Sequence, residues 1–245
     1  MNALRCADDS PCRLARRHLL HVSTVAIAST VLLPRLARAD ALTAAEREKL
    51  TPDEILAKMR RGNERFAKGE RKQRNYLREQ QASAKEGQHP AAVLLSCIDS
   101  RAPAEVIMDL GLGDIFNARV AGNILNDDIT GSMEFATKVA GAKVILVLGH
   151  TACGAIKGAI DDAQLGNLTQ LLAKIRPAVD ATTYSGAKTS KDAGFVDAVA
   201  RKNVELTVGR IRETSAVIRE LESANKVKIA GAMYNLATAK IDFFS

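Results

Sequence analysis

The sequence predicts an α/β fold: a central, mainly parallel β-sheet of four strands plus a candidate edge strand, flanked by helices and preceded by a helical arm. Two apolar runs, at 91–95 and 144–148, favour this fold. Continuous apolar runs of this length are typical of strands buried on both faces of a parallel sheet. Segments with helical spacing separate the strand-like runs, and such alternation implies a sheet covered by helices on both faces.

The length and composition are those of one sizeable domain with N-terminal additions. The chain has 245 residues, of which 47% are hydrophobic. We divide it into an export signal at 1–39, a helical arm at 40–86 and an α/β domain at 87–245. No internal repeat is visible in the sequence.

The first region has the features of an export signal. Arg16 and Arg17 form a twin-arginine pair that precedes the apolar stretch 22–33, which is too short to span a bilayer comfortably. Ala37-Arg38-Ala39 places small residues at both positions of a cleavage site before Asp40. We therefore expect a cleaved, periplasmic or otherwise exported protein with no stable membrane insertion. An uncleaved anchor or a disordered tail is the alternative.

The charge distribution argues against a nucleic-acid partner. The formal net charge is +7, but residues 1–39 contain six Arg and two Asp. Without them, 29 basic and 26 acidic residues remain, and this small, mixed charge says little about partners. The sequence also has no RNA-binding aromatic motif, zinc-finger spacing or strong basic run.

The cysteines are more informative than the charge. Once the export signal is removed, the chain holds only two cysteines and two histidines, which are Cys97, Cys153, His89 and His150. Both cysteines follow the two apolar runs named above. A disulfide or two inert buried thiols would explain them, but neither explains the acidic, basic and histidine residues beside them.

The remaining elements follow from local patterns. The arm should contain one or two helices over 44–68, outside the sheet core, since Thr51-Pro52-Asp53-Glu54 is a capping box with Pro at the first helical position. The charged stretch 70–86 is expected to form a solvated helix or a loop. After the first strand, which ends near residue 96, a second strand is expected at 115–120, a third at 143–148 and a fourth at 227–234. A candidate edge strand follows at 241–244.

Helices are expected between these strands. We expect them at 102–108, 155–160 and 168–175, and at 132–140 with Met133, Phe135, Ala136 and Val139 facing inward. The stretch 177–189 has no period and should be a loop. A single long helix is expected over 192–224, bent at Gly209.

Metal-binding residues follow both of the apolar runs, at 91–95 and 144–148. Cys97 and Asp99 come after the first, and His150 and Cys153 after the other. Sites in open α/β sheets form beyond the carboxyl ends of the strands, so neighbouring strands would bring these residues together. Two thiolates and one imidazole suit Zn²⁺, and three protein ligands leave a fourth position open for catalysis. The sequence thus predicts a catalytic zinc site.

The pattern Cys97-x-Asp99-x-Arg101, followed by His150-x-x-Cys153, resembles the β-class carbonic anhydrases. Four further motifs share this resemblance, which covers roughly 56–245: GDIF at 113–116, AGN at 121–123, GSMEFA at 131–136 and GAMY at 231–234. The resemblance implies a zinc-dependent enzyme for the reversible hydration of carbon dioxide to bicarbonate and a proton.

The resemblance also implies roles for two charged residues. In the family, zinc-bound hydroxide is oriented by an Asp that an Arg holds bidentately, which assigns catalytic roles to Asp99 and Arg101. In some members this Asp moves onto the zinc and closes the site. Asp99 is therefore also a candidate metal ligand, beside Cys97, His150 and Cys153. The alternative for this pair is a helix-capping Asp in a surface ion pair.

Three residues match the substrate pocket of the plant-type members, namely Gln88, Phe116 and Gly154. For Gln88, a solvent-facing loop position remains the alternative, and His89 is either a loop residue or a proton shuttle. Val120 replaces a polar residue of the family pattern, and the lack of Trp argues against the allosterically closed type. The resemblance implies a homodimer or a higher homo-oligomer.

Two other functions stay open at this point. A related zinc hydrolase would act on carbonyl sulfide or carbon disulfide, since the same chemistry attacks any small linear electrophile. A non-catalytic zinc or bicarbonate-binding module is the second, although a purely structural zinc is usually closed by a fourth protein ligand.

Overall fold

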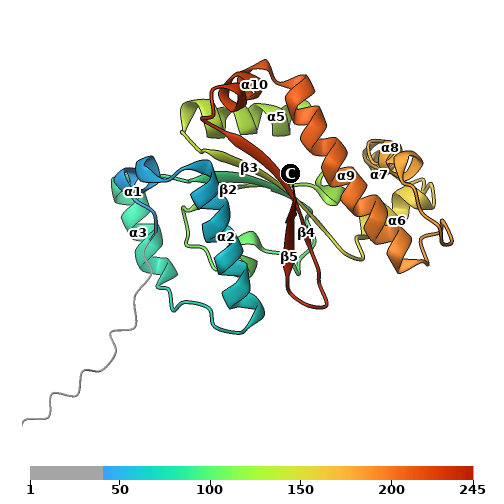
Figure 1. The fold of residues 1–245 in the computed structure, drawn as a ribbon, viewed down its shortest axis with the longest axis horizontal. Coiled ribbons are helices and arrows are strands. Elements are labelled where there is room, and N and C mark those ends of the chain that lie inside the picture. Colours follow the sequence, from blue (N-terminus) through green and yellow to red (C-terminus); the bar gives the residue numbers. More distant parts are fainter. Residues whose placement is uncertain (1–40, 245) are drawn as a thin grey trace, which may run out of the picture. The chain divides into compact units, whose positions relative to one another are not determined.

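The computed structural model describes residues 41–244, whose core is a five-stranded sheet of order β2-β1-β3-β4-β5 (Figure 1). Four strands are parallel and the last is antiparallel, which confirms the predicted fold class. The strands are β1 (Ala92–Ser96), β2 (Ile115–Arg119), β3 (Val144–His150), β4 (Lys228–Tyr234) and β5 (Ile241–Phe244). The export signal predicted at 1–39 lies outside the described residues.

Apolar residues of β1 and β3 point alternately to the two faces of the sheet, and each face carries its own core. Val93, Leu95, Ile145 and Val147 belong to one buried cluster, whereas Leu94 and the remaining apolar residues of β3 belong to the other. Both strands are buried along their whole length. Burial on both faces explains why their sequences are continuous apolar runs rather than alternating ones.

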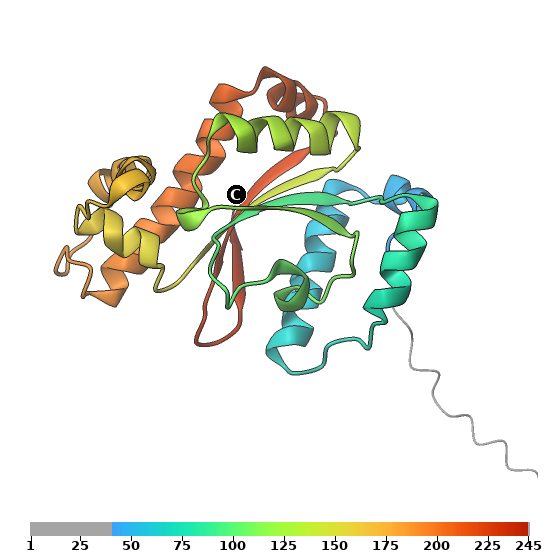
Figure 2. The same cartoon turned by 180° about the vertical axis from the view of Figure 1, so that it is seen from behind.

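Helices cover both faces of this sheet (Figures 1 and 2). On the face of Val93 and Ile145, the core is completed mainly by α5 (Asp127–Glu134), α6 (Gly154–Ile160), α7 (Gly166–Ala173), α8 (Arg176–Ala181), α9 (Ala193–Thr214) and α10 (Ala216–Ser223). On the opposite face it is completed by α2 (Pro52–Ala67) and α4 (Ala104–Ile107). None of the helices between residues 41 and 244 combines the length and apolar character needed to cross a bilayer.

The arm consists of α1 (Ala44–Lys49), α2 and α3 (Tyr76–Glu86). The predicted capping box is present, since the Thr51 side chain accepts from the Glu54 N–H and the Glu54 carboxylate accepts from the Thr51 N–H. The expectation that 44–68 lies outside the sheet core is wrong for α2. Ile55, Leu56 and Met59 are buried against the sheet, because their helical spacing forms a continuous apolar stripe.

A buried carboxylate ties this arm to the domain. Asp109, whose side chain is fully buried, accepts from Arg65 Nε at 2.6 Å, and its backbone carbonyl accepts from Arg74 at 3.0 Å. Arg74 also pairs with Glu79 of α3 at 3.0 Å, and both side chains are almost fully buried. These interactions bring part of the charged stretch 70–86 inside, although it has no apolar face.

Two predicted elements differ in the region after β2. A helix was expected at 132–140, but α5 begins at Asp127 and continues into the π-helical turn η2 (Phe135–Val139). Within this turn the Ala140 N–H donates to the Phe135 carbonyl, five residues back. Met133 and Ala136 are buried as predicted, but Phe135 and Val139 are 54% and 72% exposed rather than inward-facing.

Two further predictions were wrong in the C-terminal half. The stretch 177–189 was expected to be a loop, which holds for 182–189, but Pro177 stands in the first turn of α8, where its missing N–H costs nothing. The single helix expected over 192–224 is two helices separated at Ser215. Ser215 leaves the helical conformation, with φ −114° and ψ 107°, and its side chain caps the Ile218 N–H. Gly209 lies inside α9 without a break.

Candidate active site

Three buried donor side chains meet at the carboxyl end of the sheet. Cys97 directly follows β1, His150 ends β3, and Cys153 is the residue before α6. Since β1 and β3 are adjacent and parallel, with Ser96 opposite Leu148, their carboxyl ends lie at the same edge. The sulfur and ring-nitrogen atoms of the three residues lie within 4.8 Å of one another, and all three residues are buried.

This group of atoms fits a zinc ion. His150 Nδ1 lies 2.9 Å from the Thr151 carbonyl, so the proton belongs on Nδ1 and the Nε2 lone pair is free. His150 Nε2 is buried and has no hydrogen-bond partner within the described part of the chain. The two thiols are free, with sulfurs 4.0 Å apart. A buried imidazole nitrogen beside two thiols is a donor set of the kind that zinc prefers.

The two thiols do not ionise independently. The hydrogen bond from Cys153 lowers the pKa of Cys97, and the same contact with burial raises the pKa of Cys153. One proton therefore leaves this pair readily while the second is retained. A bound cation would be needed to release the second proton, as thiolate ligands require.

Asp99 lies beside this group and is held by Arg101. Asp99 Oδ1 accepts from the Arg101 backbone N–H at 2.9 Å and from Nε at 3.0 Å, while Oδ2 accepts from Nη2 at 2.7 Å. The Arg101 guanidinium holds the pKa of Asp99 well below its usual range. Asp99 Oδ2 is 3.9 Å from His150 Nε2, so an ionised carboxylate faces the edge of the donor group.

Arg119 has a role that the sequence prediction missed. It ends β2, opposite Ser96 in the sheet, and donates to the Cys97 carbonyl from Nε at 2.9 Å and to the Asp99 carbonyl from Nη2 at 2.6 Å. One guanidinium thus fixes the backbone on both sides of Ile98. The register of β2 against β1 accounts for this role. Arg119, the last residue of β2, lies beside the first residues of the loop that follows β1.

Glycines let the backbone approach the donor residues closely. The Gly122 N–H donates to Cys97 Sγ at 3.4 Å, and its φ of +66° is one that L-residues rarely adopt. The Gly122 carbonyl accepts from buried Asn203 at 2.8 Å. At Gly149, one residue before His150, an added Cβ would come within 2.7 Å of Met233 Sδ. Close packing therefore sets the positions of Cys97 and His150.

Comparisons with known proteins place this site in a family. The family model described as carbonic anhydrase matches residues 92–241, which include all three donor residues together with Asp99 and Arg101. The chain is 32% identical over 189 residues to a carbonic anhydrase of Mycolicibacterium smegmatis, covering 75% of this chain and 89% of that protein. It is 33% identical over 183 residues to carbonic anhydrase 2 of Mycobacterium tuberculosis, covering 73% and 86%.

Solved structures indicate the class. A tetrameric β-carbonic anhydrase of Sordaria macrospora matches with a TM-score of 0.57 and 26% identity, over 65% of this chain and 82% of that one. The chain belongs to the β-class carbonic anhydrase family. A β-carbonic anhydrase of Aspergillus fumigatus shares the fold, with a TM-score of 0.61 and 22% identity over 79% of this chain and 90% of that one.

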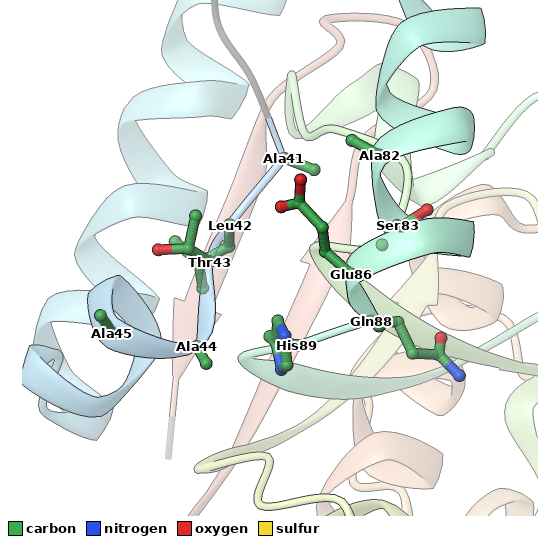
Figure 3. Close-up of a pocket in the computed structure, with 12 residues that line it drawn as sticks. Ala41, Leu42, Thr43, Ala44, Ala45, Ala82, Ser83, Glu86, Gln88 and His89 are labelled. Atoms are coloured by element: carbon green, nitrogen blue, oxygen red, sulfur yellow. The ribbon is translucent and has the colours of Figure 1, made fainter.

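For a β-class carbonic anhydrase, the three predicted pocket residues lie in different places. Gly154 opens α6 directly after Cys153 and is exposed, with open space beside its Cα. Gln88 precedes β1 and, with His89, lines a cavity of about 270 Å³ between segment 41–45 and the end of α3 (Figure 3). Gln88 is therefore near the amino end of the strand whose carboxyl end carries Cys97.

Phe116 also lies away from the donor group of its own chain. It pairs with Val93, three residues before the end of β1, and contacts Phe135 edge to face with ring centroids 6.3 Å apart. Together they line a cavity of about 590 Å³ over β2. Each strand residue advances about 3.3 Å, so Phe116 stands roughly 10 Å short of the carboxyl edge. The structure therefore brings Asp99, Arg101 and Gly154 to the donor group, but neither Gln88 nor Phe116.

Proposed function

We propose that this protein catalyses the reversible hydration of carbon dioxide to bicarbonate and a proton, with one zinc ion held by Cys97, His150 and Cys153. The observation that carries the proposal is the unpartnered, buried Nε2 of His150 between two free thiols, with an ionised Asp99 beside it. A structural zinc site would have a fourth protein ligand. Here the neighbouring carboxylate is engaged by Arg101 instead.

When bound, zinc would act as a Lewis acid that lowers the pKa of a coordinated water and makes hydroxide available near neutral pH. Asp99 orients the attacking oxygen, because an ionised carboxylate has only acceptors and draws the remaining proton of that oxygen toward itself. Arg101 keeps the carboxylate ionised and fixes its plane through two parallel N–H donors. Arg119 holds the backbone that carries Cys97 and Asp99.

We further propose a homodimer or a higher homo-oligomer. Support comes from the positions of Gln88 and Phe116, which cannot reach the donor group of their own chain and could serve only that of another copy. The related enzymes of Sordaria macrospora are described as tetrameric. Phe135, 54% exposed beside Phe116, supplies apolar surface at the same place. Mass measurement in solution tests this proposal, and a monomer that retains full activity contradicts it.

We also propose export through the segment 1–39, on the strength of its twin-arginine pair and A-x-A site. Replacing Arg16 and Arg17 with Lys should retain the precursor in the cytoplasm. The exported form should begin near Asp40. A membrane-bound protein that still begins at Met1 would instead indicate an uncleaved anchor.

Stopped-flow measurement of carbon dioxide hydration on protein of known zinc content tests the activity. We expect rapid hydration that scales with zinc across partly loaded preparations. Carbonyl sulfide and carbon disulfide should be measured in parallel. Turnover of either without carbon dioxide hydration would indicate the related hydrolase, and zinc-loaded protein inert toward all three would indicate a binding module.

A further inference from the structure

A third cavity lies toward the opposite end of the sheet from the metal-binding residues. It has a volume of about 600 Å³ and is lined by residues around α1, the turn after η2 and the start of β4. We call it the basic cavity, because it is lined by Arg47, Lys49, Lys138, Lys143 and Lys226, with Glu48 as its single acid. We propose that the basic cavity binds a small anion of the di- or polyphosphate class.

Arg47 provides the first argument for an anionic ligand. Its Nη1 donates to the Ala140 carbonyl at 2.5 Å, and its guanidinium packs against Gly141. Arg47 Nε is buried and has no partner among residues 41–244. An unmatched buried donor on a charged group is costly, and in native structures it usually indicates a water molecule or an ion. The contact with Ala140 is to a neutral carbonyl, and no carboxylate of the described residues pairs with Arg47, so its charge is uncompensated there.

Lys143 is only weakly neutralised. Its ammonium donates to the carbonyls of Glu48 and Leu50 at 2.8 and 3.0 Å, and the Glu48 carboxylate, 75% exposed, is 4.0 Å away. Those two carbonyls anchor the lysine without offsetting its charge. Arg47 and Lys143 therefore place two fixed positive charges in the wall of the basic cavity.

Lys138 and Lys226 add two exposed positive charges to the lining of the basic cavity. Both are exposed, and neither forms an ion pair within the part of the chain that the structure describes. Each also stands near a helix end, η2 or α10, where a positive charge is favourable without any ligand. That effect accounts for single lysines, but not for several cations converging on one cavity with an unmatched guanidinium donor. A multiply charged anion would satisfy them together.

The size and the donor groups of the basic cavity limit the kinds of anion that it could bind. A volume of about 600 Å³ is larger than one phosphate needs and lies in the usual range for small-molecule sites. Arginine and lysine together form the usual donor set for phosphate groups.

The cavity adjoins Lys143, at the amino end of β3, whereas His150 ends the same strand. Seven strand residues separate the two sites by roughly 20 Å. The proposal is therefore independent of the proposed catalytic function.

Calorimetric titration of pyrophosphate into the zinc-loaded protein tests the inference, with inorganic phosphate and bicarbonate as comparison anions at constant ionic strength. We expect one pyrophosphate site per chain, with weaker binding of the two smaller anions. The double variant Lys138→Gln/Lys226→Gln should weaken pyrophosphate binding by about tenfold, since it removes two charges that face the ligand. The double variant Lys138→Arg/Lys226→Arg should retain it.

The matched control is Lys85→Gln/Lys191→Gln, which removes the same charge from exposed lysines outside the basic cavity. This control should bind pyrophosphate like the unaltered protein. Equal weakening in both glutamine variants would mean non-specific attraction, and no weakening in either would mean binding elsewhere, such as at the zinc. Either result, or no heat of binding at all, overturns the proposal.

Discussion

The two loops that supply the metal-binding residues are built differently. The β1 loop, residues 97–103, is largely exposed, with Ile98 60% and the Arg101 side chain 60% accessible, and arginine side chains hold it. The β3 loop, residues 151–153, follows His150 and ends at Cys153, which are 2% and 1% exposed. Backbone contacts hold it, including Thr151 N–H to the Tyr234 carbonyl at 3.0 Å.

The two loops therefore have different roles. The β3 side binds the metal, whereas the β1 loop also places the catalytic carboxylate. At the end of β3 and in the loop that follows, His150 and Cys153 are fixed by close packing of the main chain, and Asp197 accepts the Ala152 N–H at 2.9 Å. The β1 loop contributes one ligand, Cys97, and then turns outward to present Asp99 toward the reaction. Its arginine contacts can be altered without removing a ligand. Substitutions in the two loops should therefore fail in different ways.

The largest effect is expected in the β3 loop. Cys153→Ser should abolish zinc binding and hydration together, because two ligands cannot replace a three-ligand site and a hydroxyl is a poor zinc donor. Metal analysis and stopped-flow kinetics on the same preparation measure both properties. Circular dichroism serves as the control for folding. A Cys153→Ser protein that keeps stoichiometric zinc would remove this residue from the ligand set.

In the β1 loop, Asp99→Asn should keep its zinc, since the three donor residues are untouched. Hydration should fall by roughly a hundredfold or more, the usual cost of losing one positioned proton-transfer or orienting group. The amide can present a donor where the reaction needs an acceptor. Loss of zinc in this variant would instead make Asp99 a resident ligand, as in the closed form considered from the sequence.

A smaller effect is expected one contact further away, at Arg119→Lys. Lysine keeps the charge but cannot donate along two fixed directions to the Cys97 and Asp99 carbonyls. We expect kcat to fall by about tenfold, with KM and zinc content nearly unchanged, because only the orientation of Asp99 is relaxed. Arg176→Lys, an exposed arginine paired with Asp180 away from the site, is the control. Equal losses in both variants would exclude a positioning role for Arg119.

The smallest effect concerns pH. Since Arg101 depresses the pKa of Asp99 in the folded protein, ionised Asp99 contributes stability above its unfolded pKa of about 3.9. That contribution is lost as the pH falls toward the lower folded pKa. The difference in unfolding free energy between the unaltered protein and Asp99→Asn should therefore shrink as the pH falls below about 5. Urea denaturation measures it, and a difference that grows on acidification would contradict the assignment.

What the sequence could predict was decided by local chemistry. The apolar runs of β1 and β3 identified buried parallel strands, and the residues that follow them are ones that bind zinc, so the donor group could be predicted before any coordinates. The π-helical turn over Phe135–Val139 and the helix break at Ser215 could not be predicted, because Phe and Ser both occur within ordinary α-helices. The role of Arg119 depends on the register of β1 against β2. The distance of Gln88 and Phe116 from the donor group depends on where along the strands they stand.

Three residues should hold the metal while Asp99 remains with Arg101, and a crystal structure of the zinc-loaded protein tests this directly. It should place zinc about 2.3 Å from both sulfurs and about 2.0–2.1 Å from His150 Nε2. At slightly alkaline pH the fourth position should hold no protein atom, and Asp99 should still accept both guanidinium bonds from Arg101. An Asp99 oxygen on the zinc, with those bonds broken, would contradict the account.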